Sequence, residues 1–566
     1  MSNLLITAER LRSNLESLVG EMFNLLVTSA YSTLLRESRD CSYLFLGPAG
    51  EVVVLPDDSF LHGPSYRRMV GAVLAKFGDD IDPGDVFVTN HPYDGGVPHT
   101  PDLAFIMPVH VDGRRVGFSA TLAHKADMGG SVPGSASSGA TDLHQEGFLL
   151  PVTRLRAREL DRDWSVVEAI LAANVREPGT VIGDARAQLG VTRLGARRAA
   201  GILGRYGAEA SIDAMGAMIR ATAMAVAKEI ASWPDGTASA KTVIDSDGVN
   251  LSEPVEIAVT ARVEGDSLLL DYSGTADQRR GPVNIPICYS EAACFYAVGA
   301  MLSHLIPLND GIRAVTQLIL PERSLVHPVY PGPVGAATIS IYRLIDVSLE
   351  VLGKLVPEFA VAHSGGSGGA MMAAYRREHQ DSDSALLQYE IFGTGFGASA
   401  SSDGESGVTV YATNLSLTPI EVLELQYPVR VRRFELIPDS GGAGRHRGGL
   451  SYRREYELLA DATVVRRADR IKWPSKGVAG GGDGKTGRFI LQRPGEAPQE
   501  TSGIGTYVLP AGTVLTAEGP GGGGFGNPRD RRPEDVERDL ARGLVTAQAA
   551  AAIYGYNTGQ GTGTRQ

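Results

Sequence analysis

The order in which helix-like and strand-like segments follow one another constrains the fold of this chain more than any other feature of its sequence. Leucines at three- and four-residue spacing predict one helix over residues 7–37, and a hairpin pattern follows at 42–55. Strand-like runs occupy 85–124, Ala-rich helical segments occupy 164–232, and strand patterns return at 240–275. Because strands and helices come in blocks rather than in alternation, the sequence predicts an α+β fold and not a doubly wound sheet.

The rest of the chain continues this block pattern. Helices are expected near residues 289–304 and 340–356, and a Gly-rich, mostly β segment extends to about residue 525, before two short helices at 533–554. With 566 residues the chain exceeds what one core requires, so we expect several subdomains with mixed β-sheets. The expected parts are an N-terminal α/β region (1–160), a central helical region (161–235), a mixed α/β region (236–360) and a Gly-rich β region with C-terminal helices (361–566).

Charge and cysteine usage narrow the classes of partner and compartment. Lys and Arg number 53 against 65 Asp and Glu, a net charge of −12, which argues against the basic face that nucleic-acid binding requires. No apolar run reaches the roughly 18 residues of a membrane-spanning helix, and Glu9 and Arg10 interrupt the apolar segment that a signal peptide would need. Three scattered cysteines, Cys41, Cys288 and Cys294, give no disulfide framework. We therefore expect a cytoplasmic protein without nucleic-acid or membrane partners.

Glycine is unusually abundant, with 69 residues, about twice the usual share. This abundance predicts tight turns and close approaches of backbone segments. Between residues 360 and 525 two uses stay open. The glycines and apolar loops could offer a flat backbone surface to a partner chain, or they could serve turns within a β region.

Two histidines, His99 and His124, are the strongest candidates for chemistry. His99 lies in HPYDGGVPHTPD, three residues before Asp102, and His124 ends a predicted strand, three residues before Asp127. Two imidazoles with carboxylates suit a divalent ion such as zinc, manganese or iron. Such spacings are common, so the alternative also stays open that His99 is an ordinary loop residue and His124 a hydrogen-bonded histidine at a strand end.

The segment AGGGDGKT at 479–486 fits a loose phosphate-loop pattern. A true phosphate loop leaves an apolar strand and opens a helix, whereas the strand-like GRFILQ follows here. We interpret the segment as a Gly-rich turn and expect no cofactor or ATP site on this chain. The sequence also lacks a cysteine in a reactive, histidine-flanked context.

A series of blocks between about residues 7 and 555 carries a recognisable pattern. Among them are TNHPYDGGVPHTPD, AHKADMGGSVPGS, QEGFLLP, NVREPGTVIGDARAQLG, DYSGTADQRRGPVNIP and SGGAGRHRGGL. In order and spacing these blocks resemble the hydantoinase B/oxoprolinase family over nearly the whole chain. That family includes B subunits of ATP-dependent N-methylhydantoinases and caprolactamase, the C-terminal half of 5-oxoprolinases, and subunits of acetone and acetophenone carboxylases.

The resemblance implies one divalent metal, zinc or manganese, held by this chain. The ligands that it implies are Asp40, His99, Asp102 and His124. Asp40 enters through the resemblance alone, because spacing does not suggest it.

The chain departs from the family pattern at two places near these ligands. It has NHPY at 90–93 where the family usually has Asn-Asp-Pro-Tyr, and VPH at 97–99 where Gly-Thr-His is common. His91 is therefore a further candidate around the site. Asp127 and Glu146 are expected as catalytic groups on the outer side of the ligands or toward the substrate.

The resemblance further implies that ATP binds to a separate hydantoinase A/oxoprolinase-type partner with an actin-like ATPase fold. We expect the B subunit of an ATP-dependent cyclic-amide hydrolase that opens a hydantoin, lactam or 5-oxoproline ring, as a heterodimer or an (AB)2 heterotetramer. One alternative is a component of an ATP-dependent acetone/acetophenone-type carboxylase, although those chains tend to be longer. Another alternative is a non-catalytic scaffold for the A-type partner.

Overall fold

A five-stranded antiparallel sheet organises the N-terminal part of the structure, a computed structural model that describes residues 2–376, 385–411, 413 and 415–556. The strand order is β1-β4-β3-β2-β5, and the strands are β1 (Cys41–Leu46), β2 (Val86–Thr89), β3 (Asp102–Val111), β4 (Arg114–His124) and β5 (Thr153–Leu155). Asp112 and Gly113 join β3 to β4 with φ values of 50° and 74°, as a tight hairpin turn requires. The strand-like runs predicted within 85–124 are confirmed.

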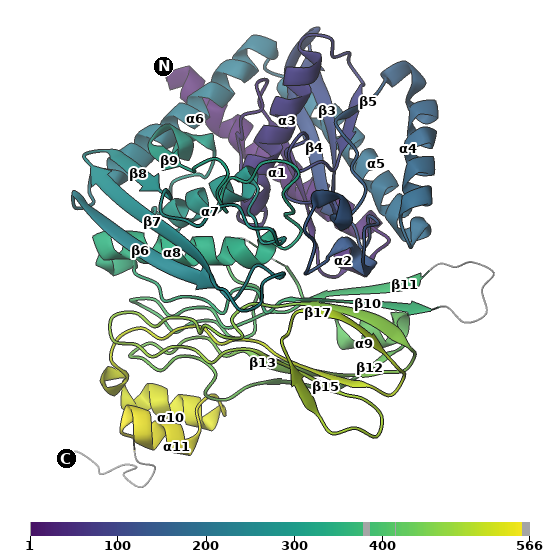
Figure 1. Ribbon diagram of the computed structural model, residues 1–566. Coiled ribbons are helices and arrows are strands. Elements are labelled where there is room, and N and C mark those ends of the chain that lie inside the picture. The colour runs from purple at the N-terminus through teal and green to yellow at the C-terminus, as the bar shows by residue number, and fades with distance from the viewer. Residues whose placement is uncertain (1, 377–384, 412, 414, 557–566) are drawn as a thin grey trace.

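Helices cover this sheet (Figure 1). They are α1 (Ser2–Ser29), α2 (Thr33–Arg36), α3 (Gly63–Phe77), α4 (Leu160–Asn174), α5 (Pro178–Leu203) and α6 (Ala208–Ile230). α5 lies against β3 and β4, and α1 lies against β1, α5 and α6. By length and composition α6 could span a membrane, but it contributes buried Ala214, Met215 and Val226 to the core, as helices inside proteins do.

The single helix predicted over 7–37 is wrong, because the chain breaks between α1 and α2. The Ser32 side chain accepts a hydrogen bond from the Leu35 amide and so caps α2. The Asp184 carboxylate of α5 accepts the amides of Tyr31 and Ser32 at 2.6 and 3.1 Å. A tertiary contact therefore ends the first helix where the leucine spacing does not.

The hairpin predicted over 42–55 forms only in its first arm. β1 is a strand, but beyond the turn only one isolated bridge, Leu46 to Val52, pairs back to it. Val52 instead donates its amide to the Asp310 carboxylate, and Leu55 bonds the carbonyl of Leu308. The second arm is thus held by a later part of the chain.

A second, four-stranded sheet follows, in the order β6-β7-β8-β9. Its strands are β6 (Gly236–Ile244), β7 (Val255–Glu264), β8 (Ser267–Asp271) and β9 (Thr316–Ile319), of which β8 and β9 are parallel. α7 (Ile287–Gly299) and α8 (Ala337–Leu355) pack against each other, and α8 also lies on β6 and β7. This arrangement places the start of α8 near the C-terminal part of the chain (Figure 1).

Two further sheets pack face to face in the C-terminal part. One has the order β11-β10-β14-β17, with β10 (Ala370–Arg376), β11 (Ala385–Ile391), β14 (Ala462–Arg467) and β17 (Gly505–Leu509). The other has the order β12-β13-β18-β15-β16, with β12 (Val429–Leu436), β13 (Tyr452–Leu458), β15 (Arg488–Gln492), β16 (Gln499–Thr501) and β18 (Val514–Glu518). Their shared core includes Met371 and Val464 from the first sheet and Tyr456, Phe489 and Leu515 from the second.

Beside these sheets lies a set of extended segments that pair by backbone hydrogen bonds without forming regular strands. Examples are the Gly449 amide to the Phe396 carbonyl at 2.8 Å and the Gly522 amide to the Gly449 carbonyl at 3.0 Å. A Cβ on Gly449 would lie 1.8 Å from the Glu405 carbonyl oxygen, so only glycine permits this approach. We call these segments the glycine bundle: 362–366, 394–398, 403–407, 440–449, 475–484 and 520–526. Figure 1 shows them running side by side between α8 and α10.

The glycine bundle shows a use of the glycines that differs from both uses left open above. Many of these residues face the backbone of a neighbouring segment of the same chain, which favours an internal role over a surface for a partner. That role is close packing of extended backbone rather than turns. Three short helices complete the part of the chain that is described: α9 (Ile420–Gln426), α10 (Pro533–Ala541) and α11 (Ala547–Ala549), the last capped by Thr546.

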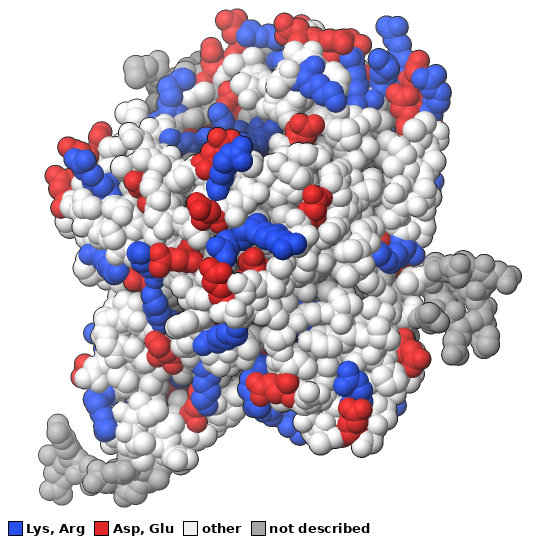
Figure 2. All heavy atoms as spheres, viewed as in Figure 1, with Lys and Arg blue, Asp and Glu red and all other residues white. Residues whose placement is uncertain are grey.

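The α+β class with mixed sheets, a helical region and a Gly-rich β part is confirmed. The four-part division at residues 160, 235 and 360 stays a prediction. On the face shown in Figure 2, acidic and basic side chains are interspersed, and no broad area of one sign covers it.

Candidate metal centre

Three neighbouring strand ends create the candidate site. Asp102 opens β3 and His124 closes β4, and the two residues are direct partners in the antiparallel register. Asp40 immediately precedes β1, and its carbonyl accepts the His124 amide at 3.1 Å. Because paired residues of adjacent strands point to the same side of a sheet, the register itself brings their side chains together.

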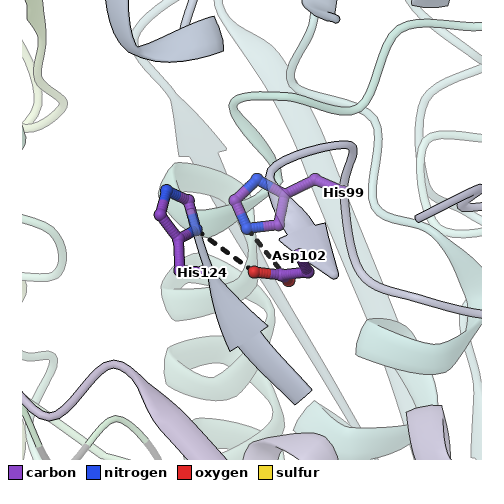
Figure 3. A group of neighbouring side chains, drawn as sticks. All are labelled: His99, Asp102 and His124. Carbon is purple, nitrogen blue, oxygen red and sulfur yellow. Dashed lines mark hydrogen bonds and ion pairs between the residues drawn. The ribbon is translucent and has the colours of Figure 1, made fainter. Parts of the chain in front are cut away.

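His99 comes from the loop before β3 and completes a compact group. Its Nε2 lies 3.2 Å from Asp102 Oδ2, and His124 Nδ1 donates to Asp102 Oδ1 at 3.1 Å (Figure 3). The Asp102 amide also bonds the His99 carbonyl at 3.0 Å, which fixes the loop to the strand. His99, Asp102 and His124 are each 5% exposed or less.

The donor atoms of this group fit a metal ion. One ligand atom from each of His99, Asp102 and His124 lies within 4.8 Å of the others, and among the described residues no second group of three such side chains gathers this closely. His124 Nε2 is buried without a hydrogen-bond partner, and Asp102 Oδ2 has only the contact with His99. Buried polar atoms are rarely left unpaired, and two imidazoles with a carboxylate suit zinc, manganese or iron. These residues could therefore hold a divalent ion.

The electrostatics of the site favour an ionised Asp102. Burial opposes its ionisation, but the charges and hydrogen bonds of His99 and His124 outweigh burial and hold the pKa of Asp102 well below its usual range. For Asp40, burial raises the pKa, with an opposing effect of His124. The carboxylate of Asp40 does not join the group of three at its close spacing, but it lines the same cavity.

That cavity has a volume of about 70 Å³. It has room for an ion and a few water-sized groups rather than for a whole large ligand. All four predicted ligands line it, so the structure brings together residues that are up to 84 positions apart, Asp40 and His124 included. Their metal binding stays a prediction.

Several residues around this cavity escaped the sequence analysis. His62 lines it and bonds Ser42 Oγ at 2.8 Å, and burial lowers the pKa of His62. Further lining residues are Arg39, Tyr289, Tyr342, Tyr389 and Arg467. No local motif marks these positions, and the four residues Tyr289, Tyr342, Tyr389 and Arg467 come from α7, α8, β11 and β14, which are distant in the chain from the predicted ligands.

The other predicted site residues lie outside the cavity lining. Asp127 accepts the amides of Gly129 and Gly134 and pairs with Arg176 at 2.8 Å. His91 accepts the Asp94 amide at 3.0 Å. These contacts hold loops in place, and the catalytic role expected for Asp127 stays a prediction.

Glu146 is also outside the cavity lining, in the segment before β5. Its carboxylate accepts the amides of Val334 and Gly335 at 3.1 and 2.7 Å, just before α8. Burial raises the pKa of Glu146 to about 8, against the effect of these two hydrogen bonds. These bonds connect Glu146 to the segment before α8, and its expected catalytic role stays a prediction.

The segment 479–486 lies mostly within the glycine bundle. The amides of Gly482, Gly484 and Lys485 donate to the carbonyls of Ala443, Ser475 and Ser440. Amides that are used in this way are not directed at a phosphate, and a strand, β15, follows instead of a helix.

Comparisons with known proteins extend along the whole chain. The profile of the hydantoinase B/oxoprolinase family matches residues 5–528. A putative D-/L-hydantoinase component of the B type, from Pseudomonas sp. (strain NS671), is 29% identical over 568 residues, covering 97% of this chain and 94% of that protein.

Two solved structures share the fold. The crystal structure of the ATP-dependent caprolactamase from Pseudomonas jessenii matches with a TM-score of 0.88 and 25% identity, over 99% of this chain and 97% of that chain. The nucleotide-free structure of acetone carboxylase matches with a TM-score of 0.87 over 97% of this chain and 79% of that chain. At 18% identity the second match is a likeness of fold alone.

Proposed function

Since this chain belongs to the hydantoinase B/oxoprolinase family, we propose that it is the metal-binding subunit of an ATP-dependent hydrolase that opens cyclic amides. The proposed substrates are rings of the hydantoin, lactam or 5-oxoproline type. Similarity to a protein named as a hydantoinase component and to a caprolactamase structure supports this class of substrate.

The observation that carries the proposal is the convergence of His99, Asp102 and His124 on one cavity. A chain that served only as a scaffold would have no need for a buried, unpaired His124 Nε2 at this place. With Asp40, which lines the same cavity, these residues would hold one zinc or manganese ion.

The residues of the chain have separable tasks in this proposal. A bound divalent ion supplies Lewis acidity toward a carbonyl or a water molecule. Asp102, held ionised, accepts the Nδ1 hydrogen of His124 and so fixes the orientation of that ring. Apolar walls that include Leu61, Ile339 and Ile391 keep bulk water out, which strengthens every electrostatic interaction inside.

The ATP requirement is assigned to a partner chain. An unstrained amide carbonyl is a poor electrophile, so ring opening needs activation. In this chain the amides of 479–486 bond neighbouring backbone, which supports an ATP site on a hydantoinase A/oxoprolinase-type partner. We propose a heterodimer or an (AB)2 heterotetramer with that partner.

Metal analysis tests the site directly. Protein purified without chelators should carry about one equivalent of zinc or manganese, and His99→Ala should lose most of it. His304→Ala removes an exposed histidine that is not part of the group and serves as the matched control. Full metal content in His99→Ala would contradict the ligand assignment.

Co-expression with an A-type partner tests the activity. The complex should hydrolyse ATP in response to hydantoin, 5-oxoproline or caprolactam, and light scattering should give the mass of a heterodimer or heterotetramer. ATP hydrolysis that responds to acetone with bicarbonate, and to none of the three ring compounds, would favour the carboxylase alternative. A complex with His99→Ala that keeps full ring-opening activity would favour the scaffold alternative.

The isolated chain should neither bind nor hydrolyse ATP. Calorimetry with micromolar ATP is the measurement, and Lys485→Ala is the informative variant because Lys485 would be the phosphate-contacting lysine of a genuine phosphate loop. ATP binding that this variant abolishes would overturn the assignment of ATP to the partner.

A further inference from the structure

Two buried arginines at the end of β14, Arg466 and Arg467, have no carboxylate partner in the part of the chain that the structure describes. The other buried arginines there are paired, as Arg343–Asp469, Arg447–Asp539, Arg454–Glu390, Arg470–Asp346 and Arg531–Asp403. A buried charge needs a counter-charge or dense hydrogen bonding, so the two exceptions require another explanation.

Arg466 is explained by its surroundings. Its guanidinium donates to three backbone carbonyls and lies over the rings of Phe392 and Phe489, at 4.8 and 5.4 Å from their centres. Carbonyl oxygens and aromatic faces together stabilise a cation without a carboxylate. Its charge needs no ligand.

Arg467 has no such surroundings. It donates to the Gly335 carbonyl and, at 3.4 Å, to the Tyr389 hydroxyl, and no aromatic ring lies under its guanidinium among the described cation–ring contacts. A guanidinium has five donor hydrogens, so most of the donor capacity of Arg467 is unused. The side chain is 3% exposed and lines the cavity of the candidate metal centre, together with His99, Asp102 and His124.

A neighbouring acid does not supply the missing charge. Glu146 interacts electrostatically with Arg467, but it forms no ion pair with it and bonds the amides of Val334 and Gly335 instead. Burial raises the pKa of Glu146 to about 8, so this side chain is largely protonated at neutral pH.

The charges that line the cavity also leave a positive excess. Asp40 and Asp102 contribute two carboxylates, and Arg39 and Arg467 contribute two guanidinium groups. A divalent ion on the proposed ligands balances the carboxylates, and because Arg39 is exposed to solvent, Arg467 is left as the uncompensated buried charge. The first turn of α8 adds Thr338 and Ile339 to the lining, and a helix N-terminus favours an anion.

We infer that Arg467 binds a carboxylate group of the ligand in this cavity and so makes the site selective for carboxylate-bearing cyclic amides or for the acids that ring opening produces. A planar guanidinium matches a carboxylate with two parallel hydrogen bonds, a geometry that lysine does not provide. The inference rests on the proposed function, because hydrolysis of a ring amide with one water yields a carboxylate and an amine. A carboxylate can therefore come from the substrate ring or from the opened product.

Binding to the wild-type chain tests the inference without any substitution. Calorimetry on the metal-loaded protein compares 5-oxoproline, its neutral amide 5-oxoprolinamide, 2-pyrrolidone and 4-aminobutyrate. We expect at least one carboxylate to bind about 10- to 100-fold more tightly than the neutral rings. Preference for 5-oxoproline identifies the substrate ring as the source, and preference for 4-aminobutyrate identifies the opened product. Equal binding of all four compounds, or no binding of any of them, overturns the inference.

Substitution of Arg467 then locates the effect. Arg467→Gln should remove the preference, and Arg467→Lys should restore only part of it because lysine keeps the charge but loses the planar fork. Arg466→Lys is the matched control, an equally buried neighbour outside the cavity lining, and it should keep the preference. Thermal unfolding and metal content are measured on each variant.

The failures of the two proposals are distinguishable. If Arg467→Gln keeps its metal and the wild-type preference for carboxylates, the inference is wrong while the proposed function stands. If the wild-type chain binds carboxylates through Arg467 but holds no metal and opens no ring with its partner, the proposed function is wrong instead.

Discussion

The sheet of β1 to β5 and the glycine bundle achieve density in opposite ways. Around the sheet, side chains fill the interior, and Leu15, Met22, Tyr43 and Phe118 are fully buried in one cluster. In the glycine bundle, backbone packs directly on backbone, with a Cβ on Gly522 placed 2.0 Å from the Phe396 carbonyl oxygen. The first region depends on apolar side chains that fill its interior, and the second depends on glycines that have no side chain.

This difference determines which substitutions each region tolerates. A side-chain core loses stability gradually as methylene groups are removed, because neighbouring side chains relax into part of the space. Segments joined by amide-to-carbonyl bonds cannot move apart to admit a methyl group without losing those bonds, and an unpaired buried backbone group is costly. The glycine bundle should therefore respond to small additions as strongly as the core responds to large deletions.

The largest expected effect is that of Gly449→Ala in the glycine bundle. The added Cβ would lie 1.8 Å from the Glu405 oxygen, and relief requires breaking bonds to two neighbouring segments. We expect a loss of about 5 kcal/mol or more, which is enough to abolish soluble expression. Soluble yield and urea unfolding are the measurements. An unfolding midpoint of Gly449→Ala equal to that of the wild type would contradict the expected sensitivity of the glycine bundle.

The next expected effect is a dependence of the free energy of unfolding on pH, which is caused by Glu146 and not by the glycine bundle. Burial raises the pKa of Glu146 to about 8 from a usual value of 4.5, so the folded protein keeps a proton that the unfolded chain releases. The free energy of unfolding should therefore fall as pH rises from 4.5 to 8, by on the order of 4 kcal/mol. Urea unfolding at several pH values should show a shallower fall in Glu146→Gln.

The glycine bundle supplies the contrast for that measurement. Its backbone bonds contain no titratable group, so hydrogen exchange of the Gly449 and Gly522 amides should show protection that changes little between pH 5 and pH 8 after correction for the intrinsic rate. Loss of protection there in parallel with the Glu146 effect would join the two regions into one cooperative unit.

A smaller effect is expected for Leu15→Ala in α1. The leucine is fully buried, and its removal leaves a cavity that the surrounding side chains only partly close. We expect a loss of about 2–5 kcal/mol with retention of the fold, measured by urea unfolding. A variant that fails to fold would show that the side-chain core is no more tolerant than the glycine bundle.

The smallest effect has the opposite sign. Gly20 lies in α1 with nothing within 4 Å of its would-be Cβ, so alanine adds no clash and restricts the unfolded chain. Gly20→Ala should stabilise the protein by about 0.5–1 kcal/mol. Substitution of glycine by alanine is thus expected to stabilise α1 and to disrupt the glycine bundle. Thermal unfolding of Gly20→Ala and Gly449→Ala measures both effects.

The sequence is most informative where hydrophobic periodicity and local motifs coincide. The strands around residues 102–124 and the pair His99 and His124 are recognisable because alternation and the HxxD spacing are local properties. The break between α1 and α2 is not recognisable, since it depends on Asp184 bonding Tyr31 and Ser32 across 153 and 152 positions.

The walls of the cavity are unpredictable for a related reason. Tyr389 and Arg467 reach the candidate metal centre only through the pairing of β10, β11 and β14, which no local pattern specifies. The glycine bundle has no hydrophobic periodicity. The abundance of glycine therefore predicts that backbone segments approach closely, but it does not predict which segments these are.

The positions of the site residues along the chain set the order in which the parts of the site form during synthesis. Asp40, His99, Asp102 and His124 all belong to the first quarter of the chain, and their strands can pair as soon as the ribosome has released them. Arg467 and Tyr389, which close the cavity, are translated much later. The ligands are therefore exposed on the nascent chain before their lid exists, and the time available for an ion to enter freely is the time that the ribosome takes to make the C-terminal sheets.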